Sequence, residues 1–470
     1  MRVFLNLLLC LWVSGLYAQE VKLSGHAERR PEGTLVRVQV YADAFSQRLT
    51  TLASTQTDSR GNFGMHFSIT EVQYALLAVS LRKTEFVLRP GSTYHFTVFP
   101  DTANQKGSVF DRQQPLAIDL KADDGRLNQQ IGRLNQQVDD FVLNHFRDVY
   151  QLHNKNVIVT FQKQIKSEFP ADISDYFKQY ARYSLASLFW AGRTESAETI
   201  AKTYFIGKKV LYHNVRYCNF FKDFFQAYFE SKINGPLTKI QLAQVVPNQN
   251  LHALDSLFSL DPLLKADARV RQLAEMVMME KYYHDKLFSS GDFDALFQQI
   301  VQRSVFVENR KVAGNYLFML RWMAPGTDAP AIHLPDIMGK EYTLSDFKDQ
   351  YVLLGFFKAD CPVCERQLPF LKNMQEKLGP DFTNITVIMG NPGEQMIQNL
   401  LSGISKWPVL LLGKRLGILE KYQIVSFPAY VLIAPHGKIA MNPAPMPEEN
   451  ALQRIIQLQN LDKKRQTHEK

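Results

Sequence analysis

Cys361 and Cys364 stand three positions apart, between a strand pattern and a helix pattern. The apolar run 351–357 before them is typical of a buried strand. A helix N-terminus carries partial positive charge and free N–H groups, so it favours the thiolate that attacks disulfides. Cys364 lies within one helical turn of Cys361 and is placed to resolve a mixed disulfide formed there. The spacing therefore predicts thiol–disulfide exchange, with Cys361 as the nucleophile and Cys364 as the resolving thiol.

Other interpretations of this pair fit the sequence less well. A zinc site needs about four ligands, and the chain has no second Cys-x-x-Cys and no close Cys/His pair. A purely structural disulfide would not require the position between strand and helix. A peroxiredoxin would have Thr or Ser where Lys358 stands, three residues before the first cysteine. We expect His333 and His436 to face solvent, and we expect no metal and no other cofactor.

The N-terminus has the charged, apolar and small-residue zones of a secretory signal peptide, which we assign to residues 1–18. The apolar run 5–16 is shorter than the about 20 residues needed to cross a bilayer, which disfavours an uncleaved anchor. Cys10 follows Leu9 inside this run, where lipid attachment would require a small residue. We therefore expect a periplasmic or otherwise extracytoplasmic protein with no membrane span after cleavage.

One further cysteine, Cys218, lies among aromatic residues. Free cysteine usually packs as a small hydrophobic residue, so we expect a buried and inert thiol. Three cysteines in the mature chain are too few for a disulfide scaffold.

Three successive patterns predict a multidomain protein. Residues 19–119 alternate apolar and polar residues in short runs, which predicts an antiparallel β-sandwich. The segments 57–63 and 88–92 contain Asp and Gly suited to tight hairpins. Residues 120–323 show helical spacing, for example at Leu127, Ile131 and Leu134, and predict an all-helical region. Its aromatic residues fit a buried helical core better than a groove for an unfolded client.

Residues 324–461 alternate strand and helix patterns, which predicts an α/β layer fold. Strands are expected at 351–357, 385–390 and 430–434, and helices from near Pro362, Glu394 and Leu416. The basic cluster at 463–465 is expected to lie in an exposed tail, residues 462–470. The 54 basic and 46 acidic residues are spread along the chain, so nucleic acid is not an expected partner.

The C-terminal motifs resemble the thioredoxin superfamily, in particular its exported TlpA-like and ResA-like branch. The segment 356–369 contains the cysteine pair, with Pro362 at the first helical position and Pro369 where the family bends its active-site helix. Residues 422–433 resemble the segment with the family's cis-proline, here Pro428, and 435–439 resemble the hairpin turn after it. Residues 329–346 resemble the extra β-hairpin of the TlpA branch.

The resemblance implies a thiol–disulfide oxidoreductase that acts on protein thiols or disulfides and is served by an unidentified redox partner. Phe427 and Pro428 would then form the wall against which a client docks. The N-terminal sandwich resembles modules that precede thioredoxin domains in exported proteins of the Bacteroidetes type. The alternative is a surface-associated binding or scaffold protein in which the redox pair is secondary.

The chain also departs from the thioredoxin pattern. Gly355 stands where thioredoxin has a buried acid, so another group or water must accept the proton of the resolving thiol. Asp360 replaces the usual Trp, and its negative charge opposes a thiolate at Cys361, whereas Lys358 offsets it. The dipeptide Pro362-Val363 replaces Gly-Pro, which leaves the reduction potential, and so the direction of exchange, open.

Overall fold

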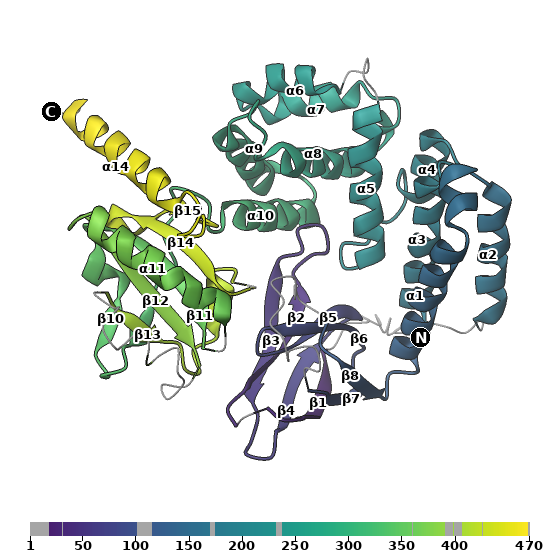
Figure 1. Cartoon of the computed structure of the whole chain (residues 1–470). Coiled ribbons are helices and arrows are strands. Elements are labelled where there is room, and N and C mark those ends of the chain that lie inside the picture. Colours follow the sequence, from purple (N-terminus) through teal and green to yellow (C-terminus); the bar gives the residue numbers. More distant parts are fainter. Residues whose placement is uncertain are drawn as a thin grey trace, which may run out of the picture.

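The computed structural model describes residues 18–30, 32–100, 115–169, 174–231, 237–359, 361–390, 398, 407–424 and 426–468. They form an N-terminal pair of β-sheets, a helical middle region and a C-terminal α/β domain (Figure 1). This architecture confirms the predicted fold class. The predicted signal peptide lies outside the described residues, except for Ala18.

The N-terminal region is a sandwich of two four-stranded sheets, with strand orders β4-β1-β7-β8 and β3-β2-β5-β6. Buried residues alternate with more exposed ones along β1, β4 and β7, and the buried set forms a core between the sheets. The pairing is antiparallel as predicted, except that β1 and β7 run parallel. The strands are β1 Gln19–Ala27, β2 Leu35–Tyr41, β3 Leu49–Gln56, β4 Asn62–Ile69, β5 Gln73–Val79, β6 Arg82–Leu88, β7 Thr93–Val98 and β8 Ile118–Ala122.

The two predicted hairpins in this region are wrong. The turns themselves are tight: the Asp58 carboxylate accepts the backbone N–H groups of Arg60 and Asn62 at 2.8 Å, and Gly61 and Gly91 have φ of 82° and 76°. However, β3 and β4 belong to different sheets, and so do β6 and β7. Each turn is an arch across the shared core. The residues of a turn predict that the chain reverses direction, but they do not predict which sheet the next strand joins.

The regular structure of the middle region is helical, as predicted, except that strand β8 continues to Ala122, three residues into the range predicted as helical. Side chains at six N-caps accept backbone N–H groups of the first turn, which explains where those helices begin: Asn154, Ser174, Ser196, Thr238, Asn250 and Asp267. The helices are α1 Leu127–Asn144, α2 Lys155–Glu168, α3 Asp175–Ala191, α4 Ala197–Tyr204, α5 Val215–Ser231, α6 Lys239–Val245, α7 Leu251–Ser259, α8 Ala268–Tyr282, α9 Ser290–Arg303 and α10 Val307–Arg321, with a π-helical turn at Arg147–Gln151 and short 3-10 turns at Val246–Asn248 and Leu264–Ala266.

Helix α5 supplies the aromatic core of this region, which confirms the prediction of a plain helical core. Phe205 is surrounded by four phenylalanine rings of α5 at centroid distances of 5.1 to 5.7 Å. Cys218 on the same helix is fully buried, as expected. Burial raises the pKa of its thiol well above the usual range, and the charge of Asp43 adds to the effect. The thiol is therefore held in its unreactive protonated form.

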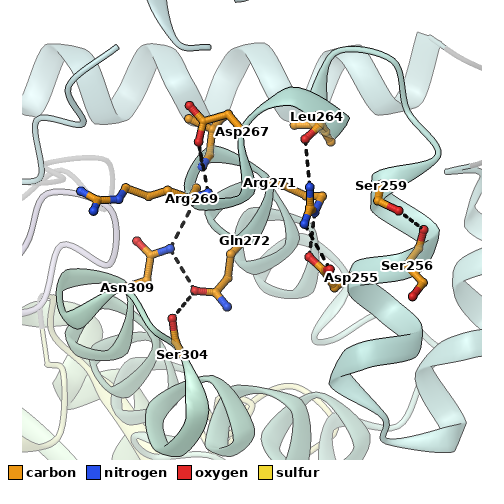
Figure 2. Close-up of polar contacts among 11 residues, drawn as sticks. Asp255, Ser256, Ser259, Leu264, Asp267, Arg269, Arg271, Gln272, Ser304 and Asn309 are labelled. Carbon is orange, nitrogen blue, oxygen red and sulfur yellow. Dashed lines mark hydrogen bonds and ion pairs between the residues drawn. The ribbon is translucent and has the colours of Figure 1, made fainter. Parts of the chain in front are cut away.

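Polar contacts fix α8 between its neighbours (Figure 2). On one side, the Arg271 guanidinium donates to both carboxylate oxygens of Asp255 on α7, at 2.7 and 3.1 Å. On the other, Gln272 Oε1 accepts from Ser304 Oγ at 2.6 Å and from Asn309 Nδ2 of α10 at 3.0 Å. Because buried amides need partners, these contacts specify how α7, α8 and α10 pack.

The sandwich and the helical region share one core. The turn between β2 and β3 reaches α5 and α10 (Figure 1), and its Phe45 is fully buried among helical residues. The Phe45 ring meets the Phe221 ring edge-on at 5.2 Å, and the Tyr316 hydroxyl donates to the Phe45 carbonyl at 3.1 Å. Asn315 Nδ2 donates to the Asp43 carboxylate at 2.7 Å. The β2–β3 turn therefore joins the two regions.

The C-terminal domain is a five-stranded sheet in the order β13-β12-β11-β14-β15. β11, β12 and β13 are parallel, whereas β14 and β15 are antiparallel to their neighbours. Residues of α11 and α14 pack in the core on one face, and residues of α13 pack on the other. The predicted extra hairpin is present as β9 and β10. The elements are β9 His333–Pro335, β10 Glu341–Thr343, β11 Tyr351–Lys358, α11 Pro362–Lys377, β12 Phe382–Met389, β13 Val409–Leu411, α13 Gly417–Lys421, β14 Ala429–Ala434, β15 Lys438–Met441 and α14 Ala451–His468.

Helix α14 extends away from the rest of the domain (Figure 1). It includes the basic cluster 463–465, which the sequence assigns to an exposed tail. Lys463 and Lys464 are exposed, but the backbone is helical. Two contacts join this end of the helix to the rest of the domain. The Tyr351 hydroxyl donates a hydrogen bond to the Asp462 carboxylate, and Lys463 Nζ lies 3.8 Å from the Asp381 carboxylate. Lys463, Lys464 and Arg465 are good helix formers, and the helix continues through them although they form no apolar face.

Candidate active site

The two cysteines lie at the carboxyl end of β11, the central strand of the sheet. Cys361 and Cys364 are joined by a disulfide bond, with their Cα atoms 5.3 Å apart. Cys361 is half-buried, whereas Cys364 is fully buried in the core that α11 forms against the sheet. Cys361 is thus partly exposed, whereas Cys364 is enclosed.

The start of α11 positions Cys361 as an N-cap. The helix begins at Pro362, where the missing N–H costs nothing. The backbone N–H of Cys364 points to the Cys361 sulfur at 3.2 Å and to the Cys361 carbonyl at 3.0 Å. The Cys364 N–H group and the positive end of the helix dipole therefore lie at the first sulfur, and both stabilise a thiolate. Pro369 lies inside α11.

Pro428 lies at the same edge of the sheet as the cysteines. The Phe427–Pro428 peptide bond is cis. Ala429 pairs with Phe356 in the antiparallel β11–β14 ladder, so Pro428 falls beside the end of β11, a few residues before Cys361. Phe427 is half-buried and packs against the core cluster that contains Cys364. The structure therefore brings the predicted site residues of both segments to one edge.

The Tyr430 ring fills the space beside Gly355, the position where thioredoxin has a buried acid. A side chain at Gly355 would put its Cβ 3.0 Å from the Tyr430 ring and 3.3 Å from the Phe357 ring. Tyr430 is almost fully buried, and its hydroxyl has no hydrogen-bond partner among the described residues. Burial raises the pKa of Tyr430 well above its usual range, and the charge of Glu448 contributes. The hydroxyl therefore stays protonated.

One buried amide on the helix of the cysteines was not predicted from the sequence. Gln367 lies three residues after Cys364 on α11 and is fully buried. Its Oε1 accepts the backbone N–H of Glu448 at 3.4 Å, and its Nε2 has no hydrogen-bond partner in the described part of the chain. The spacing of three residues was visible in the sequence. The burial of that face was not, because it depends on the sheet that covers it.

Other predicted features take no part in this geometry. His333 and His436 are exposed, as expected. Asp360, Val425 and the helix expected from Glu394 lie outside the described residues. Within the described ranges, no three His, Cys, Asp or Glu side chains gather as a metal site would require. Nor does any helix there have the length and apolar character to cross a membrane.

The sandwich also contacts the C-terminal domain, at α13 on the other face of the sheet from Cys364. Arg37 on β2 is almost fully buried and forms an ion pair with Glu420 on α13, seven residues before Phe427. Burial lowers the pKa of Arg37, and Glu420 opposes that shift. Trp322 Nε1 donates to the Lys421 carbonyl at 3.0 Å, which adds a contact from the segment after α10. Helix α13 is therefore held from outside its own domain.

Comparison with protein families gives a match for residues 325–441, to the AhpC/TSA family. Among curated proteins, the thiol-disulfide oxidoreductase ResA of Bacillus subtilis is 28% identical over 118 residues, which is 25% of this chain and 65% of the relative. The ResA protein of Geobacillus thermodenitrificans is 24% identical over 151 residues, 30% of this chain and 85% of the relative. The chain thus spans less than two thirds of the Bacillus subtilis relative.

Solved structures also match this part of the chain. The thioredoxin domain of a thiol-disulfide oxidoreductase from Bacteroides vulgatus is 35% identical, covering 25% of this chain and 86% of that chain, with a TM-score of 0.24. An exposed lipoprotein thioredoxin from Streptococcus pneumoniae is 30% identical, covering 27% of this chain and 99% of that chain, with a TM-score of 0.24.

Proposed function

The chain belongs to the thioredoxin superfamily through its C-terminal domain, and we propose that it is an extracytoplasmic thiol–disulfide oxidoreductase that acts on client proteins. One observation carries the proposal. The half-buried Cys361 sulfur sits at the N-terminus of α11, bonded to the fully buried Cys364. A structural disulfide has no need of this asymmetry, whereas exchange requires one accessible sulfur and one protected sulfur.

The exchange proceeds in two balanced steps. With the pair reduced, the Cys361 thiolate attacks a client disulfide, forms a mixed disulfide and releases one client sulfur as thiolate. Cys364 then loses its proton and attacks the Cys361 sulfur, so that the Cys361–Cys364 bond forms and the second client sulfur leaves. The client gains two electrons and the pair loses two. A redox partner restores the pair, and with the opposite potential difference the same steps run in reverse.

Phe427 and Pro428 are the proposed docking wall for the client. The Phe427 side chain is half-buried, so part of its ring remains open to another chain. Both residues lie at the sheet edge where Cys361 is accessible. An extended client segment at this edge would bring its disulfide to Cys361, and backbone pairing is the usual way such a segment is held.

An extracytoplasmic location is part of the proposal. It is supported by the charged and apolar zones of residues 1–18 and by the need for a compartment in which disulfides persist. Cleavage after Ala18 is checked by N-terminal sequencing of the exported protein.

Insulin reduction in the presence of dithiothreitol tests the activity. The full chain should speed the precipitation of the insulin B chain, and Cys361→Ser should return the rate to the uncatalysed background. Cys218→Ala is the matched control, because it removes a cysteine from the helical region and should keep the wild-type rate. Undiminished activity of Cys361→Ser would refute the assignment.

A further inference from the structure

We propose that a cavity in the helical region binds a neutral sugar ring, at a site separate from the cysteine pair. The cavity is lined by residues of α2, the end of α3 and α4, and has a volume of about 200 Å³. These helices lie on the side of the helical region away from the C-terminal domain (Figure 1). The inference therefore does not depend on the proposed function.

The size of the cavity restricts its ligand to a small molecule. Sites for drug-sized ligands have volumes of about 300–1,000 Å³, so this cavity suits a molecule on the scale of one sugar ring or one amino acid. It is partly open to solvent, which gives such a molecule a way in.

Contacts between α3 and α4 hold part of the lining in place without a ligand. The Arg182 guanidinium on α3 donates to the Thr203 carbonyl of α4 at 2.9 Å. The Tyr183 hydroxyl, also on α3, donates to the Tyr204 carbonyl at 3.3 Å. Thr203 and Tyr204 both line the cavity. A preformed site loses little conformational entropy when its ligand binds.

The lining combines an apolar surface with polar groups that have no partner. Its apolar side chains are Val159, Phe189 and Ile200. Among the described residues, neither the Gln162 amide nor the Tyr204 hydroxyl, which belong to the same lining, makes a hydrogen bond. A wholly apolar ligand would remove these groups from water without replacing their hydrogen bonds. A sugar ring offers C–H groups to the apolar side chains and hydroxyls to the polar ones.

The charges at the cavity favour a neutral ligand. Lys155 Nζ and Glu195 Oε1 form an ion pair at 2.7 Å, and both residues line the cavity. The pair leaves further N–H donors on Lys155 and a second carboxylate oxygen on Glu195. A hydroxyl group both donates and accepts, so a sugar can bond to both residues while the pair stays intact.

Tyr204 adds a donor to this arrangement. Burial raises the pKa of its hydroxyl, the charge of Arg182 opposes the shift, and the charge of Glu195 adds to it. The hydroxyl therefore keeps its proton and can donate to an oxygen of the ligand.

A free amino acid is the main alternative ligand. Lys155 could bind its carboxylate, and Glu195 could bind its ammonium group. However, these two side chains already neutralise each other, so a zwitterion would first have to separate them and give up the existing ion pair.

Saturation-transfer NMR with the full chain tests the site, with D-glucose, D-galactose, D-mannose and N-acetyl-D-glucosamine as probes and L-alanine as the comparison. At least one sugar should receive saturation from the protein, with a dissociation constant of about 1 mM, the affinity that about a dozen non-hydrogen atoms support at ordinary ligand efficiency. Gln162→Leu should weaken this binding about tenfold, as expected when a hydrogen bond inside a site is lost.

Gln164→Leu is the matched control on the same helix. Gln164 is exposed, donates through Nε2 to Glu168 at 2.9 Å and does not line the cavity, so its loss should leave the affinity unchanged. Thermal unfolding confirms that each variant is folded. If Gln162→Leu does not fold, Thr203→Trp takes its place, because the exposed Thr203 lines the cavity from α4 and a larger side chain there should block binding.

Absence of binding by all four sugars would overturn the inference, and so would an unchanged sugar affinity in a folded Gln162→Leu or Thr203→Trp variant. Binding of L-alanine alone, lost in the same variant, would assign the cavity to amino acids and also overturn it. Cys361→Ser should bind the sugar as the wild type does. A wild-type protein that exchanges no disulfide but binds the sugar would refute only the proposed function.

Discussion

The sandwich meets its two neighbours in different ways. Toward the helical region it contributes Ala44, Phe45 and Val87 to one continuous apolar core. Toward the C-terminal domain it offers a buried ion pair and the partly buried Leu35 and Leu81. The C-terminal domain has its own cores on both faces of its sheet. We infer that sandwich and helices form one cooperative frame, to which the redox domain is attached.

The largest expected effect is on the shared core. Phe45→Ala should destabilise the frame by about 3–5 kcal/mol, as large-to-small changes of buried aromatic residues do. Urea unfolding followed by tryptophan fluorescence should show the frame transition at lower urea, while the transition of the C-terminal domain stays in place. A change below about 1 kcal/mol, or an equal shift of both transitions, would break the distinction between the two contacts.

Breaking the Arg37–Glu420 ion pair should weaken the contact between the sandwich and the C-terminal domain without unfolding either of them. Arg37→Met leaves the partly buried Glu420 carboxylate without its guanidinium, at a cost of about 2 kcal/mol to the contact, less than for a fully buried pair. Limited proteolysis should then cut the 324–330 segment faster, and the insulin reduction rate should persist. Arg48→Met, which instead removes a cation–π contact with Phe318 and a hydrogen bond to Asn315 in the helical region, is the control. Unchanged proteolysis of Arg37→Met would contradict the account.

The stability of the helical region should depend on pH through one buried carboxyl group, that of Glu275. Burial raises the pKa of Glu275 on α8 well above 4.5, with the charge of Asp255 adding to it. The fold therefore holds the proton that the unfolded chain releases above about pH 4.5, and the stability of the frame falls as pH rises from there. Glu275→Gln should abolish this slope, with stability near wild type at pH 4 and higher at pH 8. Parallel pH profiles for both proteins would show that Glu275 is ionised in the fold.

The smallest effect is expected at the third cysteine. Cys218→Ala removes one buried sulfur and should cost about 1 kcal/mol of frame stability, with no change in insulin reduction. In the native wild-type protein, iodoacetamide should leave Cys218 unmodified after reduction, while Cys361 is alkylated. Rapid alkylation of Cys218 would erase the contrast between the inert and the reactive thiol.

Local chemistry was predictable from the sequence, whereas contacts between distant segments were not. The strand-to-helix placement of Cys361 and Cys364 follows from patterns within about twenty residues, and so does the turn chemistry around Gly61. The partners of Phe45 and Arg37 do not, because Tyr316 lies 271 residues beyond Phe45 and Glu420 is likewise in another domain. The two hairpin predictions were wrong for the same reason, because the sheet that a strand joins depends on packing between distant segments.

The proposed exchange depends most on Cys361 supplying the sulfur that reacts with the client. Cys364→Ala removes the resolving thiol, so a mixed disulfide formed at Cys361 should persist. The reduced variant, incubated with an excess of oxidised insulin, is digested without reductant and mapped by mass spectrometry. We predict an insulin peptide linked to Cys361 in most molecules and none linked to Cys218. An adduct confined to Cys218, or no adduct at all, would contradict the account.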